Sequence, residues 1–179
     1  MVAVLWLSVS APAQEPKSSA QAATAGNTSD PESQYAFLIG EWDVAVTLRR
    51  PGLADLSYHA RWHNHWLAGG KVVIQEWDDP FGKGIELRSY SRKDGKWHGK
   101  NLYVPDPGEW YENTAERVGE DMVVTTRRET PSGGAVVTRE IYYGIERDRF
   151  SIRTELSNDD GKTWQAGRYE ARMTRKGKP

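Results

Sequence analysis

Turn-forming residues recur along this chain at nearly even intervals, and their spacing constrains the fold more than any other feature. Between residues 35 and 176, nine groups of Gly, Pro, Asn and Asp interrupt the sequence. These residues favour turns because they supply a positive φ, a fixed φ or a local side-chain cap. The segments between them are rich in Val, Ile, Thr, Tyr or Trp, which is typical of β-strands. Ten strands are expected, near residues 41–50, 56–68, 71–78, 83–92, 96–104, 109–118, 121–129, 135–146, 149–157 and 162–174.

The short connections between these segments predict an antiparallel meander, because parallel strands need long crossovers. No long stretch repeats with the period of 3.6 that marks a helix. A meander of ten strands leaves two exposed edges unless the sheet closes on itself. We therefore expect an all-β protein, an up-and-down antiparallel β-barrel of about ten strands. A sandwich of two sheets is the alternative.

The N-terminal part of the chain has a different composition. Residues 1–13 are apolar and then small, and Ala11-Pro12-Ala13 matches a signal-peptidase site. The apolar run lacks the basic residues that usually precede it, as in a truncated signal peptide, and it is shorter than the roughly 20 residues of a membrane span. Residues 14–34 are small and polar, so we expect a disordered linker there. One domain should follow over 35–175, in a periplasmic or secreted protein.

Composition excludes several classes of site. The 179 residues include no cysteine, which excludes disulfides, thiolate zinc sites and cysteine nucleophiles. The 24 basic and 25 acidic residues leave a net charge of −1, which argues against a nucleic-acid surface. Eight Trp and eight Tyr outnumber three Phe. Rings that are apolar but carry a polar group suit a surface that must also form hydrogen bonds.

Four stretches occur together in an order that resembles one family. They are Phe37–Asp43 (FLIGEWD), Leu67–Gly70 followed by Glu76-Trp77, Tyr90–Trp97 (YSRKDGKW) and Ser157–Trp164 (SNDDGKTW). The first resembles the Gly-x-Trp opening of lipocalin and calycin barrels. Together they resemble a bacterial lipocalin-like domain of unknown function, the DUF1579 type. The resemblance implies a calycin-like barrel, often exported, of a kind that typically holds small apolar ligands and only sometimes became an enzyme.

Individual motif residues have structural roles under this resemblance. Trp42 would plug the closed end of the barrel, as the equivalent Trp does in calycins. Asp94-Gly95 and Asp160-Gly161 would form hairpin turns, because their central residues accept a positive φ. Some ten-stranded calycin relatives bind haem through a histidine in a late strand. No histidine follows His98 in this chain, so we expect no cofactor.

Three of the four histidines lie in one predicted strand, Tyr58-His-Ala-Arg-Trp-His-Asn-His-Trp66. Because side chains alternate across a strand, one face carries the histidines His59, His63 and His65. The other face carries the aromatic residues Tyr58, Trp62 and Trp66. Small barrels fill their interior with the apolar face, so the aromatic residues should point inward.

The leading functional interpretation is therefore a small apolar or aromatic molecule bound inside the barrel. The candidate ligand-binding residues are Tyr58, Trp62, Trp66, Trp77, Tyr143 and Arg168. We expect Arg168 to lie on the wet rim of a cavity or to pair with Glu76 inside the barrel, unless these charges lie on the outer face. A barrel packed solid, with a structural role, is a further possibility.

The opposite orientation of the histidine strand leads to an enzyme. His63 or His65 would then line the cavity and act with Glu76 as a general acid or base near neutral pH, in a cofactor-free lyase, isomerase or hydrolase. Trp62 and Trp66 would become an exposed patch, marking the subunit contact of a homodimer.

The histidine strand also raises the question of a metal. His63 and His65 are about 6.6 Å apart along a strand, close enough to chelate one ion. A third ligand such as Glu76 or His98 would have to come from a neighbouring strand. No spacing in the sequence identifies that ligand, so we assign no metal site here.

Overall fold

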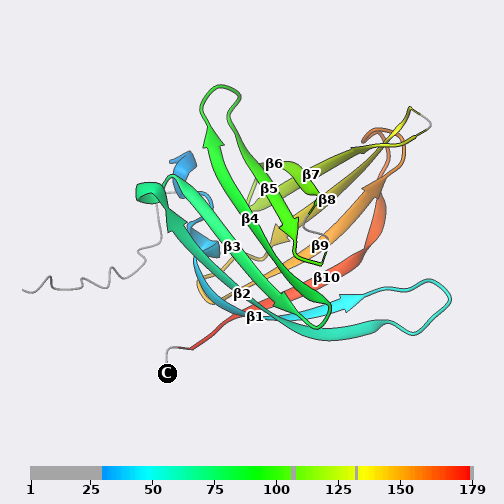
Figure 1. The fold of residues 1–179 in the computed structure, drawn as a ribbon, viewed down its shortest axis with the longest axis horizontal. Coiled ribbons are helices and arrows are strands. Elements are labelled where there is room, and N and C mark those ends of the chain that lie inside the picture. Colours follow the sequence, from blue (N-terminus) through cyan, green and yellow to red (C-terminus); the bar gives the residue numbers. More distant parts are fainter. Residues whose placement is uncertain (1–29, 106–107, 132, 178–179) are drawn as a thin grey trace, which may run out of the picture.

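The computed structural model describes residues 30–177, except 106–107 and 132. Its ten antiparallel strands close into one barrel (Figure 1). They are β1 (Gly40–Leu48), β2 (Leu56–Leu67), β3 (Val72–Asp79), β4 (Gly82–Ser91), β5 (Lys96–Tyr103), β6 (Trp110–Val118), β7 (Asp121–Glu129), β8 (Ala135–Tyr143), β9 (Arg149–Ser157) and β10 (Gln165–Arg175). The expected signal peptide, residues 1–13, lies outside the described residues, as do residues 14–29 of the expected linker.

Each strand pairs with its neighbours in the sequence, and β1 pairs with both β2 and β10. In the closing pair, Val44 of β1 lies opposite Met173 of β10. The predicted up-and-down barrel is therefore confirmed, and the two-sheet sandwich is not formed. Two strand limits differ from the prediction by three residues, and the other limits agree to within two. β8 ends at Tyr143, before a turn at Gly144, and β10 begins only at Gln165.

The late start of β10 follows from the side chain of Asp159. Its carboxylate accepts hydrogen bonds from the backbone N–H groups of Lys162 and Thr163, at 3.1 and 2.8 Å, and from the Thr163 hydroxyl. These bonds, the Thr163 hydroxyl foremost, hold the pKa of Asp159 well below its usual value. Asp160 and Gly161 both adopt positive φ, 61° and 83°. The SNDDGKTW stretch is thus a hydrogen-bonded turn that connects β9 to β10.

A short N-terminal segment closes one end of the barrel. It contains two 3-10 helices, η1 (Pro31–Ser33) and η2 (Ala36–Leu38), so the chain is ordered slightly before the predicted start at 35; a third, η3 (Ala68–Gly70), joins β2 to β3. Tyr35 and Leu38 are fully buried. Figure 1 shows η1 and η2 at the end away from the long β1–β2 and β9–β10 hairpins. Among the described residues, no helix is long and apolar enough to cross a membrane.

Trp42 completes this closed end. Its side chain is 1% exposed, and its indole N–H donates a hydrogen bond of 2.8 Å to the carbonyl oxygen of Leu38. The guanidinium of Arg175 lies 4.1 Å from the centre of the Trp42 ring. The same guanidinium donates to the carbonyl oxygens of Ile39 and Phe37, at 2.7 and 3.2 Å. Trp42 therefore occupies the position that the resemblance implied.

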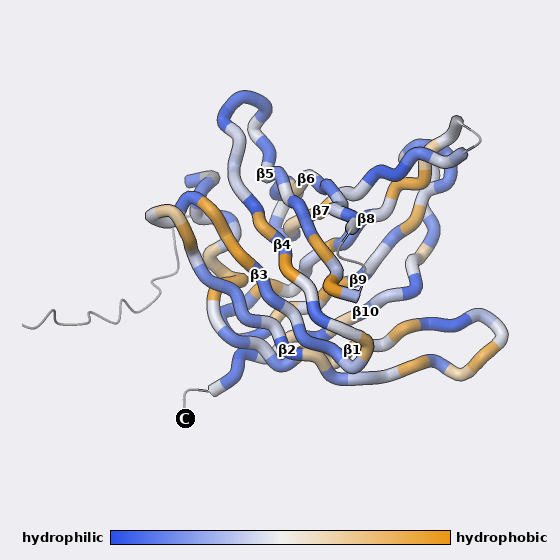
Figure 2. Tube along the Cα trace, viewed as in Figure 1, coloured by the Kyte–Doolittle hydropathy of each residue, from blue (hydrophilic) through white to orange (hydrophobic). Residues whose placement is uncertain are grey.

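Hydrophobic and hydrophilic residues are interspersed along the strands, as the hydropathy colours of Figure 2 show. In β2 the inward positions include Ala60 and Trp62, which are buried, whereas His59 and His63 are exposed. This is the orientation that the apolar-inside argument predicted. The exposed Trp62–Trp66 patch of the homodimer alternative does not form, because Trp62 is 8% exposed and Trp66 packs against the core.

Candidate ligand cavity

A cavity of about 870 Å³ lies inside the barrel, beyond the plug formed by the N-terminal segment. Its walls come from strands β1–β5 and β8–β10. Several lining residues stand at strand ends or in the β1–β2 loop at the other end of the barrel, namely Arg49, Pro51, Asp79, Leu156 and Gln165. The cavity therefore extends toward the end of the barrel opposite η2.

One wall of the cavity is aromatic. Tyr58 and Trp62 reach it from β2, and Trp77 from β3. Trp62 and Trp77 are paired across the two strands. The Trp77 ring lies over Gly84 of β4, where any side chain would collide with it. A glycine at this position therefore leaves the space that the indole occupies.

An exposed aromatic side chain stands beside this wall. Phe81, in the β3–β4 loop, is 57% exposed, and its ring centre lies 5.2 Å from that of Tyr58 in an edge-to-face arrangement. The Asp79 carboxylate holds the loop by accepting the backbone N–H of Phe81 at 2.7 Å. An apolar ring is thus presented next to the cavity wall.

The cavity also reaches a buried polar network. Arg88 and Glu86, both on β4, form an ion pair of 2.5 Å, with side chains 2% and 9% exposed. A second Arg88 nitrogen donates to Gln75 at 2.9 Å. The amide of Asn113 donates to the other Glu86 oxygen at 2.7 Å. Buried charges are costly unless they are paired and hydrogen-bonded, and this network meets that requirement for most of its atoms.

Gly99 on β5 makes room for the network. It faces Arg88 on β4 and Asn113 on β6. A Cβ at this position would collide with the side chains of both Asn113 and Glu86. The absence of a side chain at residue 99 therefore permits the hydrogen bond between Asn113 and Glu86.

A third charged group, Glu140 of β8, also lines the cavity. Burial, reinforced by the negative charge of Glu86, raises the pKa of the Glu140 carboxyl to about 7. Burial alone would lower the pKa of Arg88, but the Glu86 carboxylate raises it above its ordinary value. Arg88 therefore stays positively charged, whereas Glu140 changes its charge near neutral pH.

The rim of the cavity carries exposed charges. Arg168 lies in a bulge of β10, where the register with β9 shifts between Ala166 and Glu170. The Thr154 hydroxyl holds this bulge through bonds to the backbone of Tyr169, at 3.0 and 3.1 Å. A bulge of this kind changes the direction in which side chains point. The alternation of residues along a strand does not predict where a bulge occurs.

The structure brings together four of the six predicted ligand-binding residues. Tyr58, Trp62, Trp77 and Arg168 line the cavity. Trp66 lies nearer the closed end, with its ring centre 6.5 Å from that of Trp97. Tyr143 lies on the outer face of β8, where Arg153 stacks over its ring at 4.9 Å. Its neighbour Tyr142 points inward instead, and lines the cavity.

The predicted catalytic residues lie outside the barrel. His63 and Glu76 are cross-strand neighbours, with 3.8 Å between Nδ1 and Oε1, and their side chains are 53% and 52% exposed. His65 lies on the same outer face. Because this face points away from the cavity, the acid–base pair cannot act on a molecule inside the barrel. The alternative pairing of Glu76 with Arg168 inside the barrel is excluded for the same reason.

Sequence reasoning missed the polar network. In β4 the apolar residues Ile85 and Leu87 suggest the inward face, yet Glu86 and Arg88 are the buried ones. In β8 the apolar Ile141 suggests that its face is the inward one, but Glu140 on the opposite face points inward. Ile141 is buried although it lies on the outer face. The sequence does hold one signal for this orientation. A glycine opposite a large inward ring, here Gly84 opposite Trp77, indicates that Gly84 and every second residue after it in β4 point inward.

Comparisons with known proteins address the fold. No protein-family model matches the sequence, and no curated protein matches it. The similar solved structures include the following two. Rv2717c from M. tuberculosis has a TM-score of 0.54 and 14% identity, over 83% of this chain and 99% of that one. The S-type phycobiliprotein lyase CPES from Guillardia theta has a TM-score of 0.53 and 11% identity, over 83% of this chain and 93% of that one.

This chain has a calycin-like barrel fold. The conclusion rests on the closed ten-strand meander together with these two neighbours. At 11–14% identity the likeness concerns the fold alone.

Proposed function

We propose that this protein binds a small apolar or aromatic molecule in the barrel cavity, and that a polar or anionic group of the molecule reaches the Arg88 network. The observation that carries the proposal is the cavity of about 870 Å³ with an aromatic wall and a buried arginine among its lining residues. This volume falls within the range of about 300–1,000 Å³ usual for ligand pockets. A mostly apolar wall with a few convergent polar groups is typical of such sites.

The polar network supports a ligand over a barrel packed solid. A buried ion pair is weak evidence for a role in stability alone, because apolar residues of similar volume are often as stabilising. The Nε atom of Arg88 is buried and has no hydrogen-bond partner among the described residues. Such a donor suits a polar group carried by a ligand.

Catalysis in the same cavity is the second candidate function. Glu140 lines the cavity, and its pKa of about 7 is in the range where a carboxyl serves well as a general acid or base. One of the similar solved structures is that of a lyase, so a barrel of this kind can belong to an enzyme. This candidate replaces the His63–Glu76 pair, which lies on the outer face.

We also propose that the protein is exported and that it belongs to the lipocalin-like DUF1579 type. The Ala11-Pro12-Ala13 sequence and the polar stretch after it support export. The four ordered motifs support the family. N-terminal sequencing of the native protein from a periplasmic or secreted fraction should find a mature chain that begins near Gln14. A cytosolic protein that retains residue 1 would refute export.

The ligand proposal is tested with the neutral aromatic fluorophore phenylnaphthylamine. Trp62→Ala should weaken its binding several-fold or more, because an aromatic contact is worth about 0.5–1.5 kcal/mol beyond the buried area. Trp110→Ala is the matched control, since Trp110 is 49% exposed and does not line this cavity. His63→Ala should also leave the affinity unchanged. Equal losses in Trp62→Ala and in either control, with unchanged circular dichroism, would refute binding in the cavity.

The polar end of the proposed ligand needs a separate comparison. Anilinonaphthalene sulfonate adds one anionic group to nearly the same rings. Below about pH 7, where Glu140 is protonated, the unpartnered Nε–H donor of Arg88 should favour this anion over phenylnaphthylamine. Arg168→Ala, at the rim of the cavity, should reduce that preference. Tighter binding of the neutral probe by the native protein would show that the polar network does not receive an anion.

A further inference from the structure

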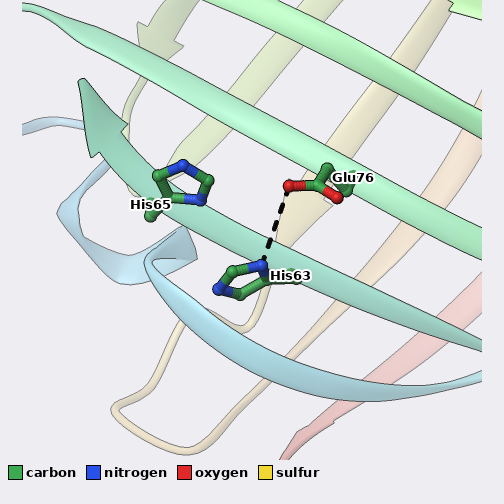
Figure 3. Close-up of side chains that lie close together, drawn as sticks. All are labelled: His63, His65 and Glu76. Atoms are coloured by element: carbon green, nitrogen blue, oxygen red, sulfur yellow. Dashed lines mark ion pairs between the residues drawn. The ribbon is translucent and has the colours of Figure 1, made fainter.

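A second group of chemically active side chains lies on the outer face of the barrel, apart from the cavity. His63 and His65 are two residues apart on β2, so their side chains leave the same face of the sheet. Glu76 on β3 is the direct cross-strand neighbour of His63. The closed barrel thus supplies the third side chain that spacing in the sequence could not identify. Figure 3 shows the two imidazoles and the carboxylate converging on one point above the sheet.

The distances suit a single metal ion. One potential ligand atom from each of His63, His65 and Glu76 lies within 4.8 Å of the others. Metal–ligand bonds of about 2.0–2.2 Å in a tetrahedral site place the ligand atoms roughly 3.3 Å apart. The 3.8 Å between Nδ1 of His63 and Oε1 of Glu76 is close to that value.

Direct contacts within the group are a long ion pair and a contact between two rings. At 3.8 Å, His63 and Glu76 are too far apart for an N–H···O hydrogen bond, which spans about 2.7–3.2 Å. The ring centres of the two histidines are 5.0 Å apart with a tilt of 31°. Nδ1 of His65 is shielded from solvent and has no hydrogen-bond partner among the described residues. The three side chains therefore converge without a hydrogen bond between them.

The surroundings add negative charge and space. Glu41 on β1 faces His63 from the other side, so two carboxylates flank this imidazole. Lys176 lies 3.5 Å from Glu41 and offsets part of that charge. A surface hollow of about 500 Å³ lies beside the site and includes His63 and Glu76 in its lining. An ion held here can therefore keep a water molecule or another small ligand.

We propose that His63, His65 and Glu76 bind a divalent transition metal ion of the zinc type, with one coordination position left open. Imidazole nitrogen and carboxylate oxygen are ordinary zinc ligands, whereas calcium and magnesium prefer oxygen alone. Structural zinc sites have four protein ligands, and catalytic ones have three with water in the fourth position. The donor set found here is of the second kind.

The proposal is independent of the cavity. The metal site lies on the outer face of β2 and β3, and the aromatic wall uses the inner face of the same strands. Failure of metal binding therefore leaves the ligand proposal intact, and the reverse also holds.

Calorimetric titration of the full-length, untagged protein with Zn²⁺ in a non-chelating buffer tests the site. The native protein should bind one equivalent. Losing a group that only hydrogen-bonds to a metal ligand typically weakens metal binding roughly 10–100-fold. His63→Ala, His65→Ala and Glu76→Gln each change a ligand itself, so each should weaken Zn²⁺ binding by more than that. His59→Ala is the matched control, because His59 shares the strand face but lies about 13 Å from His63, and it should bind Zn²⁺ as the native protein does.

Co²⁺ gives a second readout that reports geometry. The native protein should show the visible absorption of tetrahedral Co²⁺, and the three site variants should not. Binding should also weaken in acid, because protons compete for the imidazoles. The proposal is overturned if native protein and His63→Ala bind Zn²⁺ equally, if His59→Ala abolishes binding, or if Co²⁺ shows only the spectrum of the hydrated ion.

Discussion

Glu86 and Arg88 lie two residues apart on β4 and form an ion pair of 2.5 Å inside the barrel. Both side chains occupy inward positions that a strand in a small barrel usually fills with apolar residues. A buried ion pair of this kind is weak evidence for stability. Under the proposed function, its place beside the aromatic wall would let it bind a polar group of the ligand.

Removing one partner of this pair should be costly. Arg88→Met leaves the Glu86 carboxylate buried without its cation, and the free energy of unfolding should fall by about 3–5 kcal/mol. The double variant Glu86→Gln, Arg88→Met removes both charges and should recover part of that loss. Urea unfolding measures both. Arg92→Met, at an ion pair whose arginine is 82% exposed, should cost less than about 1 kcal/mol. A double variant that is less stable than Arg88→Met would contradict this account.

Glu140 should make the stability of the barrel depend on pH. Burial raises its pKa in the folded state to about 7, so between about pH 4.5 and pH 7 the folded chain binds more protons than the unfolded chain. The contribution of Glu140 is therefore most favourable in acid and is lost as the pH rises through 7. Glu140→Gln should be more stable than the native protein above this window, by on the order of 1–3 kcal/mol.

Urea unfolding at a series of pH values tests the assignment to Glu140. The difference between native and Glu140→Gln proteins should shrink as the pH falls toward about 4.5. Glu112→Gln is the control, because Glu112 is exposed on the outer face of β6. Parallel curves for native and Glu140→Gln proteins would show that Glu140 is not the group responsible.

Gly99 should tolerate no side chain. In Gly99→Ala the added methyl group meets the Asn113 and Glu86 side chains, and overpacking of this kind costs about 1–3 kcal/mol. Thermal unfolding should show the loss. Gly134→Ala, where the nearest atom would be 3.4 Å away, should change stability little. Equal stability of Gly99→Ala and the native protein would mean that the hydrogen bond between Asn113 and Glu86 is unimportant.

Arg175 should stabilise the closed end of the barrel. Arg175→Ala leaves the carbonyl oxygens of Ile39 and Phe37 without this donor, and an unsatisfied buried group costs about 1–3 kcal/mol. It also removes the cation stacked on Trp42. Arg175→Lys should restore little, because an ammonium cannot reproduce the planar donor set. Arg172→Ala, at an exposed position of the same strand, is the control. Full rescue by Arg175→Lys would show that charge alone matters.

The sequence predicted those parts of the fold that local chemistry determines. Positive φ at Gly95 and at Asp160-Gly161 follows from residue type, and the hairpins form where these residues stand. The inward orientation of Tyr58 and Trp62 follows from alternation within β2.

Other features depend on contacts between strands that the sequence does not reveal. The inward parity of β4 is set by Trp77 lying on Gly84 and by the partners of Glu86 on β6. The outward position of Tyr143 was missed because residues on both faces of β8 are covered, among them Ile141 and Tyr142. The pairing of His63 with Glu76 needs the register between β2 and β3.

The central claim, a small aromatic ligand inside the barrel, is tested most directly by nuclear magnetic resonance of the tryptophan indole N–H groups. Phenylnaphthylamine should shift the resonances of Trp62 and Trp77, which line the cavity. It should leave those of Trp110, exposed on β6, and of Trp164, stacked with Arg139 outside the cavity, in place. Shifts confined to Trp110 or Trp164, or no shift of Trp62 and Trp77 when the probe is saturating, would contradict the account.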